Sequence, residues 1–144
     1  MSNGLRAWLL DWPAHPLALA QCEVIEAIED PEVHRVPTGT GWFGAVLFWR
    51  DQLLPLALSH EQALDGMTIV VVAYQKEPRA PLEYAAIGVQ GAPRQFDVPL
   101  DADCEPPADC PLAHEHLRAF FRYQDRTVAV PELQRWFAPA AVNA

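Results

Sequence analysis

The segment Gly41 to Leu58, GWFGAVLFWRDQLLPLAL, constrains the fold more than any other part of the chain. Two apolar arms, near Ala45 to Trp49 and Leu53 to Leu58, flank the polar pair Asp51-Gln52. Apolar runs separated by a short polar turn are typical of a β-hairpin. Arg50 stands at the edge of this turn, with no reactive side chain beside it. The segment therefore predicts a β-hairpin that displays one cation.

A proline, Pro55, lies within the second arm of this hairpin. Proline has no backbone N–H to donate to a neighbouring strand, so within sheets it occurs at edges or bulges. We therefore expect the second arm to lie at a sheet edge or to carry a bulge at Pro55.

Other short segments also have the composition of strands. The clearest is Met67 to Tyr74, MTIVVVAY, which is rich in β-branched residues. Further strands are expected at Arg6–Trp12, Leu17–Ala20, Glu83–Val89, Gln95–Leu100, Phe120–Tyr123 and Thr127–Val130. Periodicity does not decide between helix and strand for Gln21 to Glu29. Nine or ten short strands predict an all-β barrel or sandwich.

Helices and loops are expected to be short, because the chain holds 14 prolines against 7 glycines. A capping-box pattern predicts one helical turn from Ser59 to Gly66, and a second short helix is expected to begin at Pro131-Glu132. The regions from Pro31 to Gly41 and from Asp101 to Leu112 are predicted to be loops.

Length and charge limit the classes of function. A chain of 144 residues is expected to form one domain, and its 19 acidic and 10 basic side chains give a net charge of -9. The basic residues are not clustered, so nucleic acid is not an expected partner. The longest run without charge, Leu64 to Gln75 apart from Asp65, is too short to span a bilayer, so membrane insertion is not expected. An odd number of cysteines does not predict a disulfide framework. We therefore expect a cytoplasmic protein.

Two groups of residues could carry chemistry. Cys104, Cys110, His114 and His116 supply two thiols and two imidazoles, although their spacing departs from that of common zinc fingers. This set leaves open the alternative of a small zinc-binding domain. The pair His60-Glu61 lacks a nearby nucleophile, so no enzyme activity is expected. Cys22 lies in an apolar stretch, which favours packing over reactivity.

The order of several motifs resembles that of the CheW-like domains, the chemotaxis coupling protein family. Gly44, Arg50 and Pro55 match positions in the family pattern G-x-x-N-L-R-G-x-x-x-P-V-x-D-L, and Leu17–Leu19 with Val24–Glu26 match an earlier family segment. Near the end of the chain, Gln124–Val130 and Leu133–Phe137 resemble the family ending G-D-R-x-V-L-L-V-x-x-x-K-L-L. The resemblance covers approximately residues 6–137, and the tail 138–144 is expected to be frayed.

The chain also departs from the family pattern. The interval from Gly44 to Arg50 is one residue longer, and Asp51 replaces the glycine after the arginine. Because glycine often supports positive φ in a tight turn, the turn geometry is expected to differ. These departures favour a divergent adaptor, for example in a chemosensory system for pili and surface motility.

The resemblance implies two small five-stranded β-barrel subdomains that share a hydrophobic seam. It also implies an adaptor without cofactor that couples the signalling tip of a chemoreceptor to a histidine kinase. By position, Val24, Gly44 and Arg50 are the candidates for receptor binding. Partial exposure is expected for Trp42 or Trp49 beside Arg50, and burial for Trp8 and Trp136. The alternative that Arg50 only pairs with Asp51 or a turn carbonyl remains open.

Overall fold

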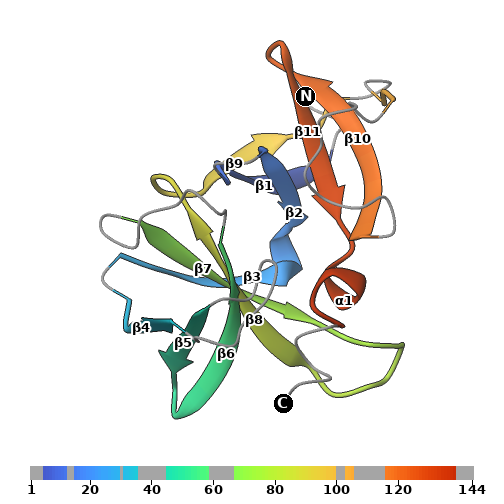
Figure 1. Cartoon of the computed structure of the whole chain (residues 1–144). Helices are drawn as coiled ribbons and strands as arrows, with labels where there is room; N and C mark the ends of the chain where they lie inside the picture. Colours follow the sequence, from blue (N-terminus) through green and yellow to red (C-terminus); the bar gives the residue numbers. More distant parts are fainter. Residues whose placement is uncertain are drawn as a thin grey trace.

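A computed structural model describes residues 5–12, 15–29, 31–35, 45–58, 67–99, 103–105 and 116–138. Most of this part of the chain is β-structure (Figure 1). Its strands are β1 (Arg6–Leu10), β2 (Leu17–Ala20), β3 (Val24–Ile28), β4 (Val33–Arg35), β5 (Ala45–Trp49), β6 (Gln52–Ala57), β7 (Thr68–Tyr74), β8 (Glu83–Val89), β9 (Arg94–Asp97), β10 (Leu117–Tyr123) and β11 (Arg126–Pro131). Its helical segments are η1 (Gln21–Glu23) and α1 (Leu133–Trp136). The predicted all-β class is confirmed.

The strands form two sheets. Both ends of the chain build a five-stranded sheet in the order β10-β11-β2-β1-β9, in the upper half of Figure 1. The middle of the chain builds a six-stranded sheet in the order β3-β7-β8-β6-β5-β4. The expectation of two five-stranded barrels is therefore corrected, because β4 adds a sixth strand where a loop was predicted, and strand pairing within the described residues closes neither sheet.

Side chains join strands from opposite ends of each sheet. In the first sheet, the ring of Phe96 on β9 lies 5.9 Å from that of Phe121 and 4.8 Å from that of Tyr123, both on β10. In the second, the Trp49 indole on β5 donates a hydrogen bond to Glu26 on β3. Each sheet therefore curls around its own apolar core.

Central strands are buried on both faces, and alternation divides their side chains between two cores. On β7, Ile69 and Val71 point into the core of the second sheet, whereas Val70 and Val72 point into a cluster between the sheets. We call this cluster the seam. Its buried members are Leu10, Trp12, Leu17, Leu19, Ala57, Val70, Val72, Tyr74, Ala85, Ile87, Val89, Phe120, Ala129, Leu133, Trp136 and Phe137. The continuous apolar run of β7 reflects this double burial.

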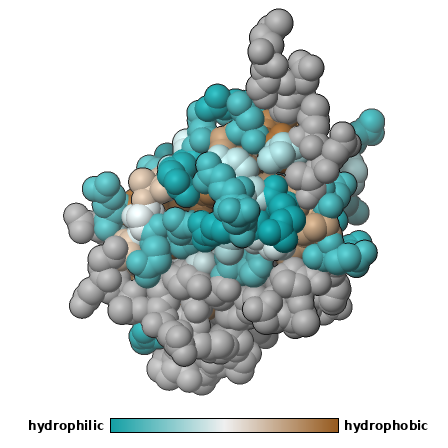
Figure 2. Space-filling view, turned by 90° about the horizontal axis from the view of Figure 1, so that it is seen from above, coloured by the Kyte–Doolittle hydropathy of each residue, from teal (hydrophilic) through white to brown (hydrophobic). Residues whose placement is uncertain are grey.

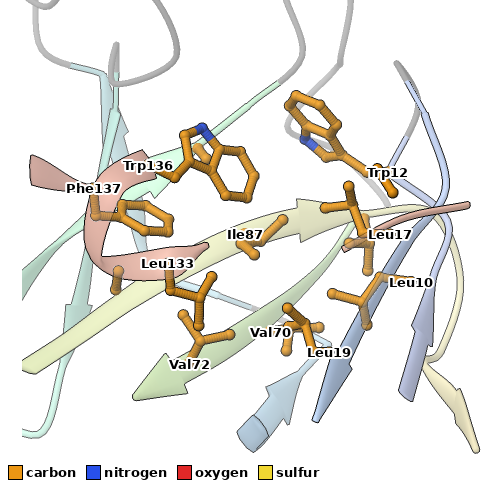
Figure 3. Close-up of a cluster of buried hydrophobic side chains, with 14 of the residues drawn as sticks. Leu10, Trp12, Leu17, Leu19, Val70, Val72, Ile87, Leu133, Trp136 and Phe137 are labelled. Carbon is orange, nitrogen blue, oxygen red and sulfur yellow. The ribbon is translucent and has the colours of Figure 1, made fainter. Parts of the chain in front are cut away.

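The helix α1 and the residue that follows it contribute three large side chains to the seam (Figure 3). Leu133, Trp136 and Phe137 are almost inaccessible to solvent. The indole of Trp136 meets that of Trp12 edge to face at 5.3 Å, which joins the end of the chain to its beginning. Burial in the seam also raises the pKa of Tyr74 to about 12.

Several local predictions need correction. The last helix begins at Leu133 and not at Pro131, because Pro131 pairs with Leu117 as the final residue of β11. Trp8 is only partly buried, and Cys22 is exposed in η1 and does not pack in the core.

Several predicted segments lie wholly or largely outside the described residues. The helical turn predicted at 59–66 and the end of the tail fall there, as does most of the loop at 101–112.

Candidate protein-binding site

The turn between β5 and β6 comprises two residues with left-handed backbone. Trp49 pairs with Gln52 to close the hairpin, while φ is 46° at Arg50 and 62° at Asp51. Positive φ at both central residues defines the type I′ geometry that matches the twist of the flanking strands. The turn is therefore Arg50-Asp51 rather than Asp51-Gln52. Aspartate tolerates this conformation better than most residues, which explains how it stands where glycine was expected.

The prediction that Pro55 lies at an edge or bulge is wrong. β6 lies inside the sheet between β5 and β8, and Pro55 pairs with Val46 of β5 in regular register. The paired residues of β6 and β8 begin only at Leu56. The pairs of an antiparallel hairpin alternate between hydrogen-bonded and non-hydrogen-bonded, and counting from the closing pair Trp49–Gln52 places Val46–Pro55 among the non-hydrogen-bonded pairs. β5 therefore needs no N–H donor from Pro55. The missing donor is therefore tolerated.

Trp49 fastens the turn to the other end of the sheet. Its Nε1 donates to Oε2 of Glu26 at 2.8 Å, and its ring lies 5.3 Å from that of Tyr84. Only 6% of Trp49 is exposed, so the partial exposure expected for Trp42 or Trp49 does not hold for Trp49, and Trp42 lies outside the described residues. The indole is held by contacts on its inward side.

Arg50 stacks on the indole that precedes it. The guanidinium carbon lies 4.5 Å from the centroid of the Trp49 ring, within the range of a cation–π contact. The side chain is exposed, and among the described residues it forms neither an ion pair with Asp51 nor one with any other carboxylate. The stacking leaves the N–H donors of Arg50 free to bind a carboxylate from another molecule.

Val24 is the first residue of β3, the strand that also carries Glu26, whose carboxylate binds Trp49. It is half-buried, packs against the seam, and is separated from Glu26 by an irregularity in the pairing with β7. The structure therefore links Val24, Trp49 and Arg50 through β3 and its hydrogen bond to the hairpin. Gly44, the fourth candidate, lies outside the described residues.

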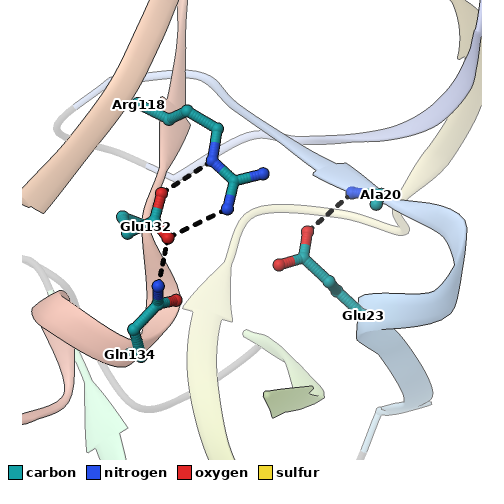
Figure 4. Close-up of polar contacts among 5 residues, drawn as sticks. All are labelled: Ala20, Glu23, Arg118, Glu132 and Gln134. Atoms are coloured by element: carbon teal, nitrogen blue, oxygen red, sulfur yellow. Dashed lines mark hydrogen bonds and ion pairs between the residues drawn. The ribbon is translucent and has the colours of Figure 1, made fainter. Parts of the chain in front are cut away.

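Charged side chains lie near Glu23, the residue that precedes Val24 (Figure 4). Arg118 on β10 donates two hydrogen bonds to Glu132, at 2.6 and 2.9 Å, and Gln134 donates a third. These bonds, led by those from Arg118, lower the pKa of Glu132. Burial raises the pKa of Glu23, although its bond from the Ala20 N–H at 2.8 Å opposes that shift. The Arg118–Glu132 pair joins β10 to the residue that precedes α1, while the Ala20–Glu23 bond lies within the crossover between the sheets.

The sequence prediction missed two kinds of residue near the turn. Glu26 positions Trp49. The only feature of the sequence that pointed to Glu26 was the family motif around Val24. Phe48 and Leu53 form an exposed apolar cross-strand pair. Apolar residues at alternate positions on both arms could have indicated an apolar outer face.

The zinc alternative is not tested by the structure. Cys104 is half-buried beside the seam and His116 precedes β10, whereas Cys110 and His114 lie outside the described residues. In the part of the chain that the structure does describe, no three potential metal ligands gather.

None of the helices within the described ranges is long and apolar enough to cross a membrane.

Comparison with solved structures identifies the fold. No protein-family profile and no curated protein matches the chain. Among solved structures, the chain is similar to the scaffolding protein TtCheW from Thermoanaerobacter tengcongensis, with a TM-score of 0.65 and 12% sequence identity. The match covers 90% of this chain and 89% of that one. The predicted resemblance is thus confirmed in three dimensions, and this chain has the CheW-like fold.

Proposed function

We propose that this protein is a non-enzymatic adaptor that couples the signalling tip of a chemoreceptor to a histidine kinase in a bacterial chemosensory pathway. The fold supports an adaptor role, since the solved structure it matches is a scaffolding protein. The departures in sequence favour a pathway that drives pili or surface motility.

The observation that carries this proposal is the display of Arg50. A left-handed turn, a stacked indole and the Glu26 bond hold the guanidinium at the tip of the hairpin, and no carboxylate within the described residues neutralises it. Holding an unpaired cation in one place reduces the entropy lost when it binds a partner. An arginine presented in this way favours a carboxylate on another protein.

Val24 supplies the apolar part of the proposed receptor site. It lies where the crossover from the first sheet enters β3, so its exposed portion borders both sheets. An amphipathic helix that binds there would place an apolar side chain against Val24 and an acidic one against Arg50. Gly44 and Trp49 complete the proposed site, with Trp49 acting as support for the cation.

The test is binding of a purified chemoreceptor signalling domain to Arg50→Glu. We expect at least a tenfold loss of affinity, because a charge pair becomes a like-charge contact. Arg79→Glu is the matched control, since Arg79 is also an exposed arginine with positive φ, 70°, in another turn. Unchanged binding by Arg50→Glu, or equal loss in both variants, would contradict the assignment of the site.

A second measurement tests the adaptor role itself. In sedimentation of receptor signalling domain with kinase, addition of this protein is expected to bring both into one complex. If neither protein associates with it at any ratio, the proposed function is wrong whatever the role of Arg50.

A further inference from the structure

We infer that the crossover between the two sheets is a pH-sensitive hinge, which is held closed by one proton on Glu23 and loosened when that proton leaves. The hinge consists of η1 with its flanking residues Ala20 and Val24, and it links β2 of the first sheet to β3 of the second. This regulation goes beyond the adaptor role, and only its effect on receptor binding rests on the proposed function.

Glu23 differs from other carboxylates near the first sheet in having no cation of its own. The described surface over this sheet is mostly hydrophilic (Figure 2). Several of its arginines pair with carboxylates, Arg6 with Asp97 and both Arg94 and Arg126 with Asp11. Within the described residues, no cation forms an ion pair with the half-buried Glu23. A carboxylate taken partly out of water without a cation favours its protonated form.

The guanidinium that attracts Glu23 is already bound to another carboxylate. Arg118 donates two hydrogen bonds to Glu132, at 2.6 and 2.9 Å, and forms none to Glu23 (Figure 4). The charge of Glu132 also repels that of Glu23. Two carboxylates therefore depend on one guanidinium, and a proton on Glu23 removes the excess negative charge.

The strands that pack against η1 supply no further cation for Glu23. These strands are β1 and β7, whose only charged or titratable side chains are Arg6 and Tyr74. Arg6 is paired with Asp97, and Tyr74 is neutral near neutral pH because its pKa is about 12. Burial therefore raises the pKa of Glu23, although the Ala20 N–H and Arg118 oppose the shift.

The hydrogen bond within the hinge is compatible with both forms of Glu23. Its Oε1 accepts the Ala20 N–H at 2.8 Å, and an oxygen of a protonated carboxyl group can accept the same bond. The ionised form differs by its cost of desolvation and by repulsion from Glu132. An opened hinge exposes Glu23 to water and relieves both. The hinge therefore opens more often as Glu23 ionises.

The opening can remain local to the start of β3. Val24 is half-buried against the seam, and an irregularity in the pairing with β7 separates it from Glu26. The regular pairs of β3 begin only beyond this irregularity. Loosening of η1 can therefore free Val24 while the rest of β3 keeps its partners.

Amide hydrogen exchange followed by NMR from about pH 4.5 to about pH 8 tests the hinge. Protection factors at Ala20 and Val24, which correct for the intrinsic pH dependence of exchange, report its opening. We expect them to fall with rising pH, by at most about tenfold per pH unit because one proton is released, and then to level off. They should stay below those of β8 at every pH, since the hinge opens without global unfolding.

Three variants separate Glu23 from other causes. Glu23→Gln is neutral at every pH and keeps the acceptor oxygen, so its protection factors should be constant and close to the wild-type values at low pH. Glu29→Gln is the matched control, because it removes an exposed carboxylate just beyond the other end of β3 and should leave the pH dependence unchanged. Glu132→Gln should weaken the dependence, since Arg118 then faces one carboxylate instead of two.

Three results would overturn the inference. One is a pH dependence in Glu23→Gln equal to that of the wild type. Another is equal protection of the hinge and β8, because Glu23 would then be exposed only by global unfolding. The third is protection that rises with pH, since the Ala20 bond and Arg118 would then outweigh burial.

Receptor binding gives a separate outcome. If Val24 belongs to the receptor site, the wild type should bind the signalling domain more tightly at low than at neutral pH, and Glu23→Gln should lose most of that difference. Absence of receptor binding at any pH would contradict the proposed function and leave the exchange result, and with it the hinge, standing.

Discussion

Two hairpins of this protein have the same turn and opposite surroundings. The β5–β6 turn has positive φ at Arg50 and Asp51, and the β10–β11 turn has it at Gln124 and Asp125, so neither uses glycine. β10 places Phe120 in the seam and Phe121 in the core of the first sheet. The outer face of β5, in contrast, leaves Phe48 accessible to solvent.

The cations at the two turns differ in the same way. Arg126 follows its turn and forms an ion pair with Asp11 at 3.2 Å, whereas Arg50 stacks on Trp49 and has no carboxylate partner among the described residues. The first cation joins two parts of the fold, and the second remains available. The comparison shows that turn chemistry sets the shape of a hairpin, while the faces of its strands decide whether it serves the core or a partner.

The largest expected contrast is between two phenylalanines. Phe121→Ala should lower the free energy of unfolding by about 3–5 kcal/mol, because it opens a cavity in a packed core. Phe48→Ala should lower it by less than about 1 kcal/mol, since much of that ring is already in water. Urea unfolding of both variants measures the difference. Similar losses would show that the β5–β6 hairpin is as structural as the other.

Removing the indole donor of Trp49 should have an intermediate effect. Trp49→Phe leaves Glu26 without its hydrogen bond in a partly buried position, which should cost about 2 kcal/mol. Glu26→Gln is the control, because its amide oxygen can still accept the bond. Equal destabilisation by the two changes would mean that charge, and not the hydrogen bond, holds the turn against β3.

The ion pair next to the β10–β11 hairpin should depend on pH. Because the pKa of Glu132 is lowered from 4.5 in the folded protein, its stabilisation is present above that value and is lost as the pH falls through the folded pKa. Glu132→Gln should therefore cost about 1 kcal/mol at neutral pH, a modest value because Arg118 is 63% exposed, and nothing in strong acid. A cost that is the same at both pH values would contradict this role.

Glu23 should show the opposite slope. Its pKa is raised by burial, so the folded protein loses stability as the pH rises from 4.5 through the folded pKa of this group. Glu23→Gln should remove that loss and stabilise the protein at neutral pH relative to acid. Unfolding curves in urea across this range decide the sign, and a variant that is less stable at neutral pH would show that the bond to Ala20 outweighs desolvation.

The smallest expected effect is at the turn itself. Asp51→Gly should stabilise the protein by no more than about 0.5 kcal/mol, because the gain in left-handed backbone is offset by greater freedom in the unfolded chain. Asp125→Gly is the matched change in the other hairpin and should give a similar value. A loss of stability at Asp51 alone would indicate that this carboxylate makes a contact of its own.

The sequence predicted the β-class, the main strands and the hairpin, because these depend on local composition and on turn residues. The sequence-based predictions failed where a strand depends on pairing with a partner that is distant in the sequence. β4 has only three residues between prolines and exists because it pairs with β5. Pro55 is tolerated inside a sheet because pairing with β8 begins after it, which no local pattern reveals.

For the candidate site, the sequence suggested residues but not their orientation. The family resemblance proposed Arg50 and Val24, and Trp49 was added as the aromatic residue beside Arg50. The inward orientation of Trp49, however, follows from the curling of the sheet that brings Glu26 to it. The same curling decides that Phe48 faces outward. The apolar residues on both arms of the β5–β6 hairpin do not indicate which face of the hairpin packs against the core.

Hydrogen–deuterium exchange with a chemoreceptor signalling domain tests the central claim most directly, since it follows both hairpins in one experiment. We predict that peptides spanning Ala45–Ala57 and Val24–Ile28 become protected on binding, while those spanning Leu117–Pro131 do not change. Protection of the β10–β11 hairpin with none at β5–β6 would contradict the account.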